Sequence, residues 1–239
     1  MPPPELAMPN DYLPPSCREL AFEAVPYIVC EVDLDGYDLA LRRADKTGKP
    51  FGSVAGLAAA EPFVFATNAG MYHEDLTPVG FYVEDGVEQS PLNLSDAPGN
   101  FFMKPNGVFY VDEQGNAGVL ESTAYAASAI RPKLATQSGP MLVIDGKLHP
   151  RFEENGASRY IRNGVGTNGG RHVVFAISRQ PVSLGSFARL FRDALGIRNA
   201  LFFDGAISAL HDGRKYLVGG GHPAGPILAV TKKPGEAAQ

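Results

Sequence analysis

The chain contains no tryptophan, only two cysteines among its 239 residues, and no cluster of lysine or arginine. Its formal net charge is -5, which makes nucleic acids and anionic membrane surfaces poor partners. No apolar run approaches the roughly 20 residues that a membrane-spanning helix needs. The first residues, MPPPELAMPNDYLPP, lack the apolar centre of a signal peptide. We therefore expect no membrane span and no nucleic-acid partner.

The two cysteines, Cys17 and Cys30, lie close together near the start of the chain. They are compatible with two buried free thiols or with a disulfide formed in an oxidising compartment. The sequence has no CxxC pattern and no His-Cys cluster with zinc spacing. The residues therefore predict neither a metal site nor a cofactor.

Short strand-like runs between turn residues dominate the sequence, which has 27 Gly and 20 Pro. Strands are predicted near residues 27–34, 63–70, 171–178, 199–204 and 224–233. Hairpin turns are predicted at Asp35-Gly36, Asp85-Gly86, Gln114-Gly115-Asn116 and Asp145-Gly146.

One segment, 183–195, has clear helical periodicity, and a weaker helix is predicted within 51–62. The order strand, helix, strand from 172 to 204 predicts a βαβ unit. We expect a single α+β domain with a mixed, mostly antiparallel sheet, many hairpins and few helices. The predicted boundaries are a Pro-rich leader at 1–16, the domain at 17–233 and a tail at 234–239.

Five polar clusters interrupt apolar strands beside glycine. They are Asn68; Asn106; Gln137 with Ser138 and Gly139; Arg162 with Asn163; and Asp204 with Gly205 and Ser208. Asn-Gly and Asp-Gly are also common turn dipeptides, so each cluster has a purely structural alternative. We assign Asn155 and Asn168 to turns, whereas Asn68 and Asn106 stay open between turn and site.

Arg162 is either a surface arginine or an anion-binding group. Anion binding is suggested by the segment Gly164-Val165-Gly166 after it, which we expect to be flexible backbone that an anion can approach. His73 follows the Asn68 cluster and is a further site candidate. A second carboxylate to accompany Asp204 is not obvious; Glu74, Asp75 and Glu121 are the weak candidates.

Taken in order, the motifs NAGMY, PNGVF, QSGPMLVIDG, RNGVG and NALFFDGAIS resemble those of the phosphodiester glycosidase family. The resemblance runs from about Cys17 to the final strand and is strongest to the bacterial branch. The family reaction removes N-acetylglucosamine from a phosphodiester and leaves a phosphomonoester. The resemblance thus implies a hydrolase that acts on a small-molecule or glycan sugar-1-phosphodiester.

Several residues match the family's motifs: Asn68, Ser138 with Gly139, Arg162, Asp204 with Gly205, and Ser208. Of these, Asp204, Arg162 and Asn68 are expected to be catalytic. Substrate binding is expected of Asn106, Gln137, Ser138, Gly139, Asn163, Gly205, Ser208 and His73. The bacterial branch tends to carry two early cysteines, so a Cys17–Cys30 disulfide and a periplasmic or otherwise extracytoplasmic location are implied.

Ala206 and Ile207 stand where part of the family has glycines, which predicts side chains that crowd the sugar pocket. Two other functions are alternatives to phosphodiester hydrolysis. A non-catalytic module that binds carbohydrate or an envelope polymer would keep the same site without turnover. A metal-dependent phosphodiesterase is disfavoured, because no His/Asp cluster has two-metal spacing.

Overall fold

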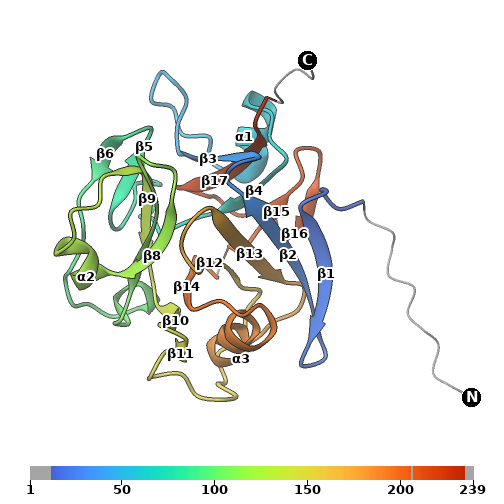
Figure 1. The fold of residues 1–239 in the computed structure, drawn as a ribbon. Coiled ribbons are helices and arrows are strands. Elements are labelled where there is room, and N and C mark those ends of the chain that lie inside the picture. The colour runs from blue at the N-terminus through green and yellow to red at the C-terminus, as the bar shows by residue number, and fades with distance from the viewer. Residues whose placement is uncertain (1–11, 206, 235–239) are drawn as a thin grey trace, which may run out of the picture.

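The computed structural model describes residues 12–205 and 207–234, which form three sheets (Figure 1). All strand pairings in these residues are antiparallel. The first sheet has seven strands, in the order β1 (Cys17–Phe22), β2 (Val25–Asp33), β13 (His172–Ser178), β12 (Asn163–Thr167), β14 (Asn199–Phe202), β10 (Met141–Ile144) and β11 (Lys147–Leu148).

The other two sheets have five strands each. The second sheet is ordered β16 (Tyr216–Val218), β15 (Leu210–His211), β4 (Phe65–Asn68), β17 (Ile227–Lys232) and β3 (Tyr37–Arg42). The third is ordered β6 (Val87–Ser90), β5 (Tyr82–Glu84), β9 (Pro132–Ser138), β7 (Gly107–Asp112) and β8 (Ala117–Glu121).

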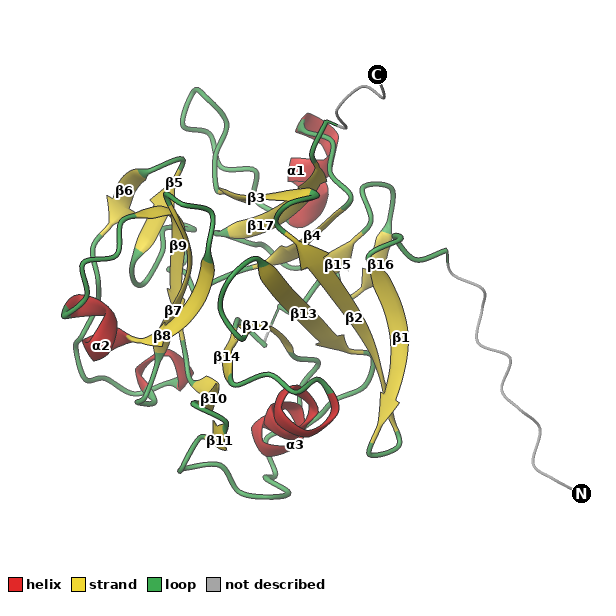
Figure 2. Ribbon diagram, viewed as in Figure 1, coloured by secondary structure: helices red, strands yellow, loops and turns green. Residues whose placement is uncertain are grey.

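The helices are short and lie on the outside of the sheets (Figure 2). They are α1 (Val54–Ala60), α2 (Ser122–Ala126), α3 (Leu184–Arg189), a 3₁₀ turn (Asn100–Phe102) and a π-helical turn (Leu190–Ala194) that continues α3. No helix in the described part of the chain is long and apolar enough to cross a membrane.

One central core is shared by the inner faces of all three sheets, and separate apolar clusters cover their outer faces. Strand β13 shows the pattern: Phe175 and Ile177 face the central core, whereas Val174 and Ala176 face the cluster beneath α3. Since both faces of this strand are covered, its sequence is a continuous apolar run instead of an alternating one.

The predicted fold class is confirmed: the sheets are antiparallel and the helices few. Strands β13 and β14 both pair with β12 in antiparallel fashion, so they run parallel to each other, and α3 connects them. The βαβ unit therefore exists, with β12 inserted between its strands. The weaker helix corresponds to α1, and hairpins close at Asp85-Gly86, Gln114-Gly115-Asn116 and Asp145-Gly146.

The hairpin predicted at Asp35-Gly36 is wrong. The chain does turn there, with Gly36 N–H donating to the carbonyl of Asp33 at 3.0 Å. However, β2 is paired on its two edges with β1 and β13, so β3 joins the second sheet beside β17. An Asp-Gly dipeptide fixes the turn but not the partner of the strand that follows it.

The flexible segment predicted at Gly164-Val165-Gly166 is also wrong, because these residues lie inside β12, which is buried along its whole length. A Cβ on Gly164 would lie 2.7 Å from the carbonyl oxygen of Leu201. One on Gly166 would lie 2.6 Å from Ile197 Cγ2. The glycines thus allow close packing of neighbouring backbone and of the residues around α3.

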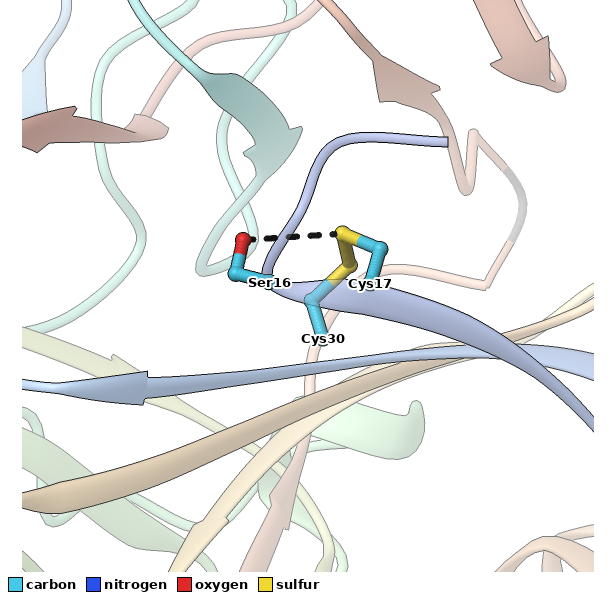
Figure 3. The surroundings of a disulfide bond; sticks show 3 residues. All are labelled: Ser16, Cys17 and Cys30. Carbon is cyan, nitrogen blue, oxygen red and sulfur yellow. Dashed lines mark hydrogen bonds between the residues drawn. A yellow bond between two sulfur atoms is a disulfide. The ribbon is translucent and has the colours of Figure 1, made fainter. Parts of the chain in front are cut away.

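Cys17 and Cys30 form a disulfide across the β1–β2 pair, where they stand directly opposite each other (Figure 3). The Ser16 hydroxyl lies 3.9 Å from Cys17 Sγ. Strand β1 is the outermost strand of the first sheet, whereas β2 lies further in and carries much of the core. The bond therefore ties an edge strand to the packed interior.

Reduction of this disulfide is expected to lower the free energy of unfolding by about 3 kcal/mol, since it closes a loop with a sequence separation of 13 residues. Urea unfolding with and without dithiothreitol measures the effect. A Cys17→Ser/Cys30→Ser double variant is the control, and its stability should not respond to the reductant. Equal stability of the oxidised and reduced wild type would contradict the prediction.

Candidate active site

Two buried asparagine side chains join the first sheet to the second. Asn68 ends β4, and Asn163 begins β12. Asn163 Nδ2 donates to Asn68 Oδ1 at 3.0 Å and to the Asn68 carbonyl at 2.9 Å. Asn163 Nδ2 also lies 2.8 Å from Thr67 Oγ1, which in turn donates to the carbonyl of Ala209 at 2.8 Å. These amides are therefore part of the framework of the site.

The same network holds the chain that follows β14. Asn68 Nδ2 donates to the Asp204 carbonyl at 3.1 Å, and Asn68 Oδ1 accepts from Ala209 N–H at 2.9 Å. Ser208 Oγ lies 3.2 Å from the Asp204 carbonyl and 3.0 Å from Asn163 Oδ1. Both ends of the segment from Asp204 to Ala209 are thus fixed. Asp204 itself is partly exposed. Its backbone position is set by the buried side chains of Asn68 and Ser208.

Arg162 immediately precedes β12 and is only 1% exposed, so the alternative of a surface arginine is excluded. Its Nε donates to the Val182 carbonyl at 2.8 Å, and its Nη2 donates to the Ser158 carbonyl at 2.9 Å. The rings of Tyr160 and Phe202 lie 5.5 and 5.2 Å from the guanidinium carbon. Two backbone carbonyls and two aromatic rings therefore fix the group.

The guanidinium charge has no carboxylate within ion-pairing distance among residues 12–205 and 207–234. Burial lowers the pKa of Arg162 to about 10, which still leaves it protonated at neutral pH. Its Nη1 lies beside Gly205, where a Cβ would be only 3.3 Å away. A buried, oriented cation thus points toward the residue that follows Asp204.

Asn106 directly precedes β7 and packs against Gly139, while Ser138 ends β9 as the partner of Gly107. Asn106 Nδ2 donates to the Phe101 carbonyl at 2.8 Å. Within residues 12–205 and 207–234, Asn106 Oδ1 and Ser138 Oγ are buried and have no hydrogen-bond partner. At Gly139 a Cβ would meet the Phe101 carbonyl at 2.6 Å, so no side chain fits there. Two buried oxygens thus remain available to a donor.

Segment 139–140 connects this pair to the rest of the site. The Pro140 carbonyl accepts from Phe202 N–H at 3.2 Å, and Met141 is the partner of Leu201. On the other side of β14, Phe203 N–H donates to the Asn163 carbonyl at 3.1 Å. The backbone therefore brings the clusters of Ser138, Asn163 and Asp204 together at the end of β14. Asn68 joins them through its side-chain contact with the Asp204 carbonyl, and Asn106 lies next to the partner of Ser138.

Two predicted site residues have other surroundings. Gln137 uses its amide to hold a neighbouring segment: Oε1 accepts from Phe81 and Asn93 N–H at 2.9 Å each, and Nε2 donates to the Asn93 carbonyl at 2.7 Å. His73 is exposed in a turn closed by its own backbone and that of Thr77. Substrate contact by either residue stays a prediction.

The weak candidates for a second carboxylate serve local structure. Asp75 Oδ1 accepts from Thr77 N–H at 3.0 Å, and Glu121 Oε2 accepts from Ala124 N–H at 2.9 Å at the start of α2. Glu74 is exposed in the turn that follows His73. No group of three or more His, Cys, Asp or Glu residues with metal-binding geometry occurs in the described parts of the chain.

Tyr72 was not among the predicted site residues, although it closes the NAGMY motif. Its hydroxyl donates to the Pro223 carbonyl at 2.6 Å. Burial, followed by the charge of Asp204, raises the pKa of Tyr72 to about 12. The phenol is thus neutral at physiological pH and lies within electrostatic reach of Asp204.

The expected crowding by Ile207 stays a prediction. Its side chain packs against the apolar cluster formed by α1 and the second sheet, together with Phe51 and Phe63. That packing gives the isoleucine a role in the core. Ala206, the other residue of this prediction, lies outside the described residues.

Asn163→Asp is expected to lower the free energy of unfolding by about 3 kcal/mol or more, because a carboxylate oxygen would replace the donor that faces two Asn68 oxygens. Chemical denaturation at pH 7 measures the change. Asn168→Asp is the matched control: this exposed asparagine donates to the Gly196 carbonyl at 3.1 Å and accepts from Arg198 N–H at 2.7 Å. Similar losses in the two variants would contradict a special role for the buried pair.

Residues 61–215 match the family model described as phosphodiester glycosidase. The chain is 39% identical over 158 residues to the uncharacterized protein YigE of Escherichia coli (strain K12). That alignment covers 66% of this chain and 59% of YigE, so the chain spans less than two thirds of this relative.

Two solved structures are similar in fold. The catalytic domain of zebrafish N-acetylglucosamine-1-phosphodiester alpha-N-acetylglucosaminidase, auto-inhibited by its pro-peptide, superposes with a TM-score of 0.63 at 12% identity, over 91% of this chain and 82% of that one. A hypothetical protein from Synechocystis gives a TM-score of 0.60 at 15% identity, over 90% and 61%. With the family model covering more than half of its length, this chain belongs to the phosphodiester glycosidase family.

Proposed function

We propose that this protein hydrolyses the glycosidic bond of a sugar-1-phosphodiester, releasing the sugar and a phosphomonoester. The observation that carries the proposal is the buried guanidinium of Arg162, which has no carboxylate partner in the described residues and whose Nη1 lies beside Gly205. A buried cation is costly unless an anion compensates it. A phosphate is well matched to arginine in charge and geometry.

The substrate chemistry fits a site with one prominent carboxylate. Phosphate is a good leaving group and needs little protonation, so the paired carboxyl groups typical of glycosidases are less necessary. As the C1–O bond breaks, its electron pair stays on the phosphate oxygen, beside Arg162. Asp204 then stabilises the positive charge at C1 or activates the attacking water. Water supplies the new oxygen on the sugar, and its proton leaves to the carboxylate or to solvent.

The buried amides act in this proposal as positioning residues. Asn68 and Ser208 hold the backbone of Asp204, and Asn163 holds Asn68. Asn106 and Ser138 are the proposed polar contacts to the substrate, because each has a buried oxygen to which no other described residue donates a hydrogen bond. Gly205 lets the backbone pack closely against Phe202 and Arg162, since a Cβ there would lie 2.7 Å from Phe202 Cζ and 3.3 Å from Arg162 Nη1.

The partner is accordingly a small-molecule or glycan phosphodiester. We place the reaction outside the cytoplasm, in the periplasm or another oxidising compartment. The Cys17–Cys30 disulfide supports that location, since such bonds persist under oxidising conditions. The family of the chain supports the substrate class.

Asp204→Asn is expected to lower the rate on a sugar-1-phosphodiester by about two to four orders of magnitude, the scale of a positioned acid–base group. The amide keeps the shape of the side chain but removes its charge. Asp145→Asn is the control, since Asp145 precedes a glycine in an ordinary hairpin turn. Thermal melting on the same samples checks the fold. Near wild-type turnover by a folded Asp204→Asn protein would refute the role of Asp204.

Arg162→Lys is expected to weaken inhibition by inorganic phosphate by about 1.5–3 kcal/mol, because lysine cannot reproduce the fixed fork of donors. The structure also leads us to expect a loss of thermal stability, since the contacts to Val182 and Ser158 are lost. Arg192→Lys is the control, as Arg192 pairs with Asp193 at the surface. A folded Arg162→Lys protein with unchanged phosphate inhibition would contradict the assignment.

A further inference from the structure

The segment 219–225, GGGHPAG, connects β16 to β17 and has an unusual backbone. Gly219, Gly220 and Gly221 all have positive φ angles, of 68°, 103° and 84°. Three consecutive residues in this conformation require glycine or a residue that tolerates it. At Gly221 an added Cβ would meet nothing within 4 Å, so this backbone borders open space.

The glycine segment is anchored against the site at both ends. A Cβ on Gly219 would lie 2.0 Å from the Ser208 carbonyl, so the two backbones are in close contact. At the other end, a Cβ on Gly225 would lie 2.8 Å from Tyr72 Cβ. The Tyr72 hydroxyl also donates to the Pro223 carbonyl at 2.6 Å. The segment therefore runs from the end of the Asp204–Ser208 stretch to the ring of Tyr72.

Arg162 and Tyr72 contact different parts of this stretch. Arg162 Nη1 approaches Gly205, and its guanidinium carbon lies 5.5 Å from the centre of the Tyr160 ring. The charge of Asp204 acts instead on Tyr72, whose ring is partly exposed. Tyr72 is therefore joined to the Asp204–Ser208 stretch through the glycine segment, whose Gly219 packs against the Ser208 carbonyl, whereas the guanidinium lies beside Gly205.

We propose that Tyr72 and the backbone of Gly219–Gly221 form the subsite for the sugar ring, next to Asp204 and apart from Arg162. The inference rests on the proposed function and adds to it the orientation of the substrate. An aromatic face packs against the C–H groups of a pyranose, and the free peptide groups of a glycine segment can hydrogen-bond its hydroxyls. The phosphate then lies at Arg162, with C1 beside Asp204.

The test measures two affinities separately on the full chain by NMR titration, with N-acetylglucosamine as the sugar probe and inorganic phosphate as the anion probe. Tyr72→Ala is expected to weaken sugar binding by at least about tenfold and to change phosphate binding by less than about twofold. Tyr160→Ala is the matched control, because this 54% exposed tyrosine lies over the Arg162 guanidinium. It should leave sugar binding unchanged.

Gly221→Asn is a second variant that spares the packed interior. Asparagine tolerates a positive φ, and its side chain would enter the open space beside the segment. It is also expected to weaken sugar binding selectively. The subsite is overturned if the wild type binds no N-acetylglucosamine, if Tyr72→Ala leaves sugar binding unchanged, or if both variants weaken the two probes equally.

The same measurements separate this inference from the proposed reaction. One outcome is that both variants selectively weaken the binding of N-acetylglucosamine while the wild type hydrolyses no sugar-1-phosphodiester. The proposed reaction is then wrong, and the subsite stands. If the wild type hydrolyses the phosphodiester and the variants alter only inhibition by phosphate, the subsite is wrong and the reaction stands.

Discussion

The reciprocal pairing of Asn68 with Asn163 is the constraint on which the site depends. Each amide belongs to a different sheet, and each is at most 2% exposed. A buried amide must satisfy its donors and acceptors inside the protein, so the register of the two strand ends is fixed by polar contacts as well as by packing. Asp204 takes its backbone position from this pair. The carboxylate is therefore placed by groups that need not touch a substrate themselves.

Arg162 differs from the asparagine pair, whose hydrogen-bonding groups are satisfied inside the protein. It is a buried charge that no carboxylate of the described residues neutralises. Its two carbonyl contacts and two aromatic neighbours orient the guanidinium, but none of them carries a full negative charge. Burial accordingly lowers its pKa. Groups held in such surroundings are frequently functional, because an incoming charge of opposite sign gains more there than at the surface.

Local chemistry predicted much of the fold. Asp85-Gly86 and Asp145-Gly146 close hairpins because their turns require positive φ angles, which both residues of each pair adopt. Continuous apolar runs correctly identified strands covered on both faces, as in β13. The first strand was missed because its turn uses Glu23 and Ala24, both with positive φ and neither a turn-forming type. Glu23 is instead fixed by the distant Arg189, at 2.6 Å.

The errors share a physical origin in tertiary contacts. Asp35-Gly36 turns the chain as expected, but other strands already occupy the edges of β2. Gly164 reads as flexible in isolation, yet its hydrogen atom permits contact with a neighbouring strand. The polar clusters were found because a polar side chain at the end of a buried strand needs a partner or a function. The sequence did not distinguish those two outcomes, which is why Asn68 and Asn106 stayed open.

The candidate site residues come from two sheets, which has a consequence for how a substrate would act on the protein. Arg162 precedes β12 and Asp204 follows β14, both in the first sheet, whereas Asn68 ends β4 and the glycine segment connects β16 to β17, all in the second. A ligand that contacts Arg162 at one end and Tyr72 at the other would therefore connect two sheets that otherwise meet here through buried amides. Because it would bind only when both are in register, its binding energy would add directly to the stability of that junction.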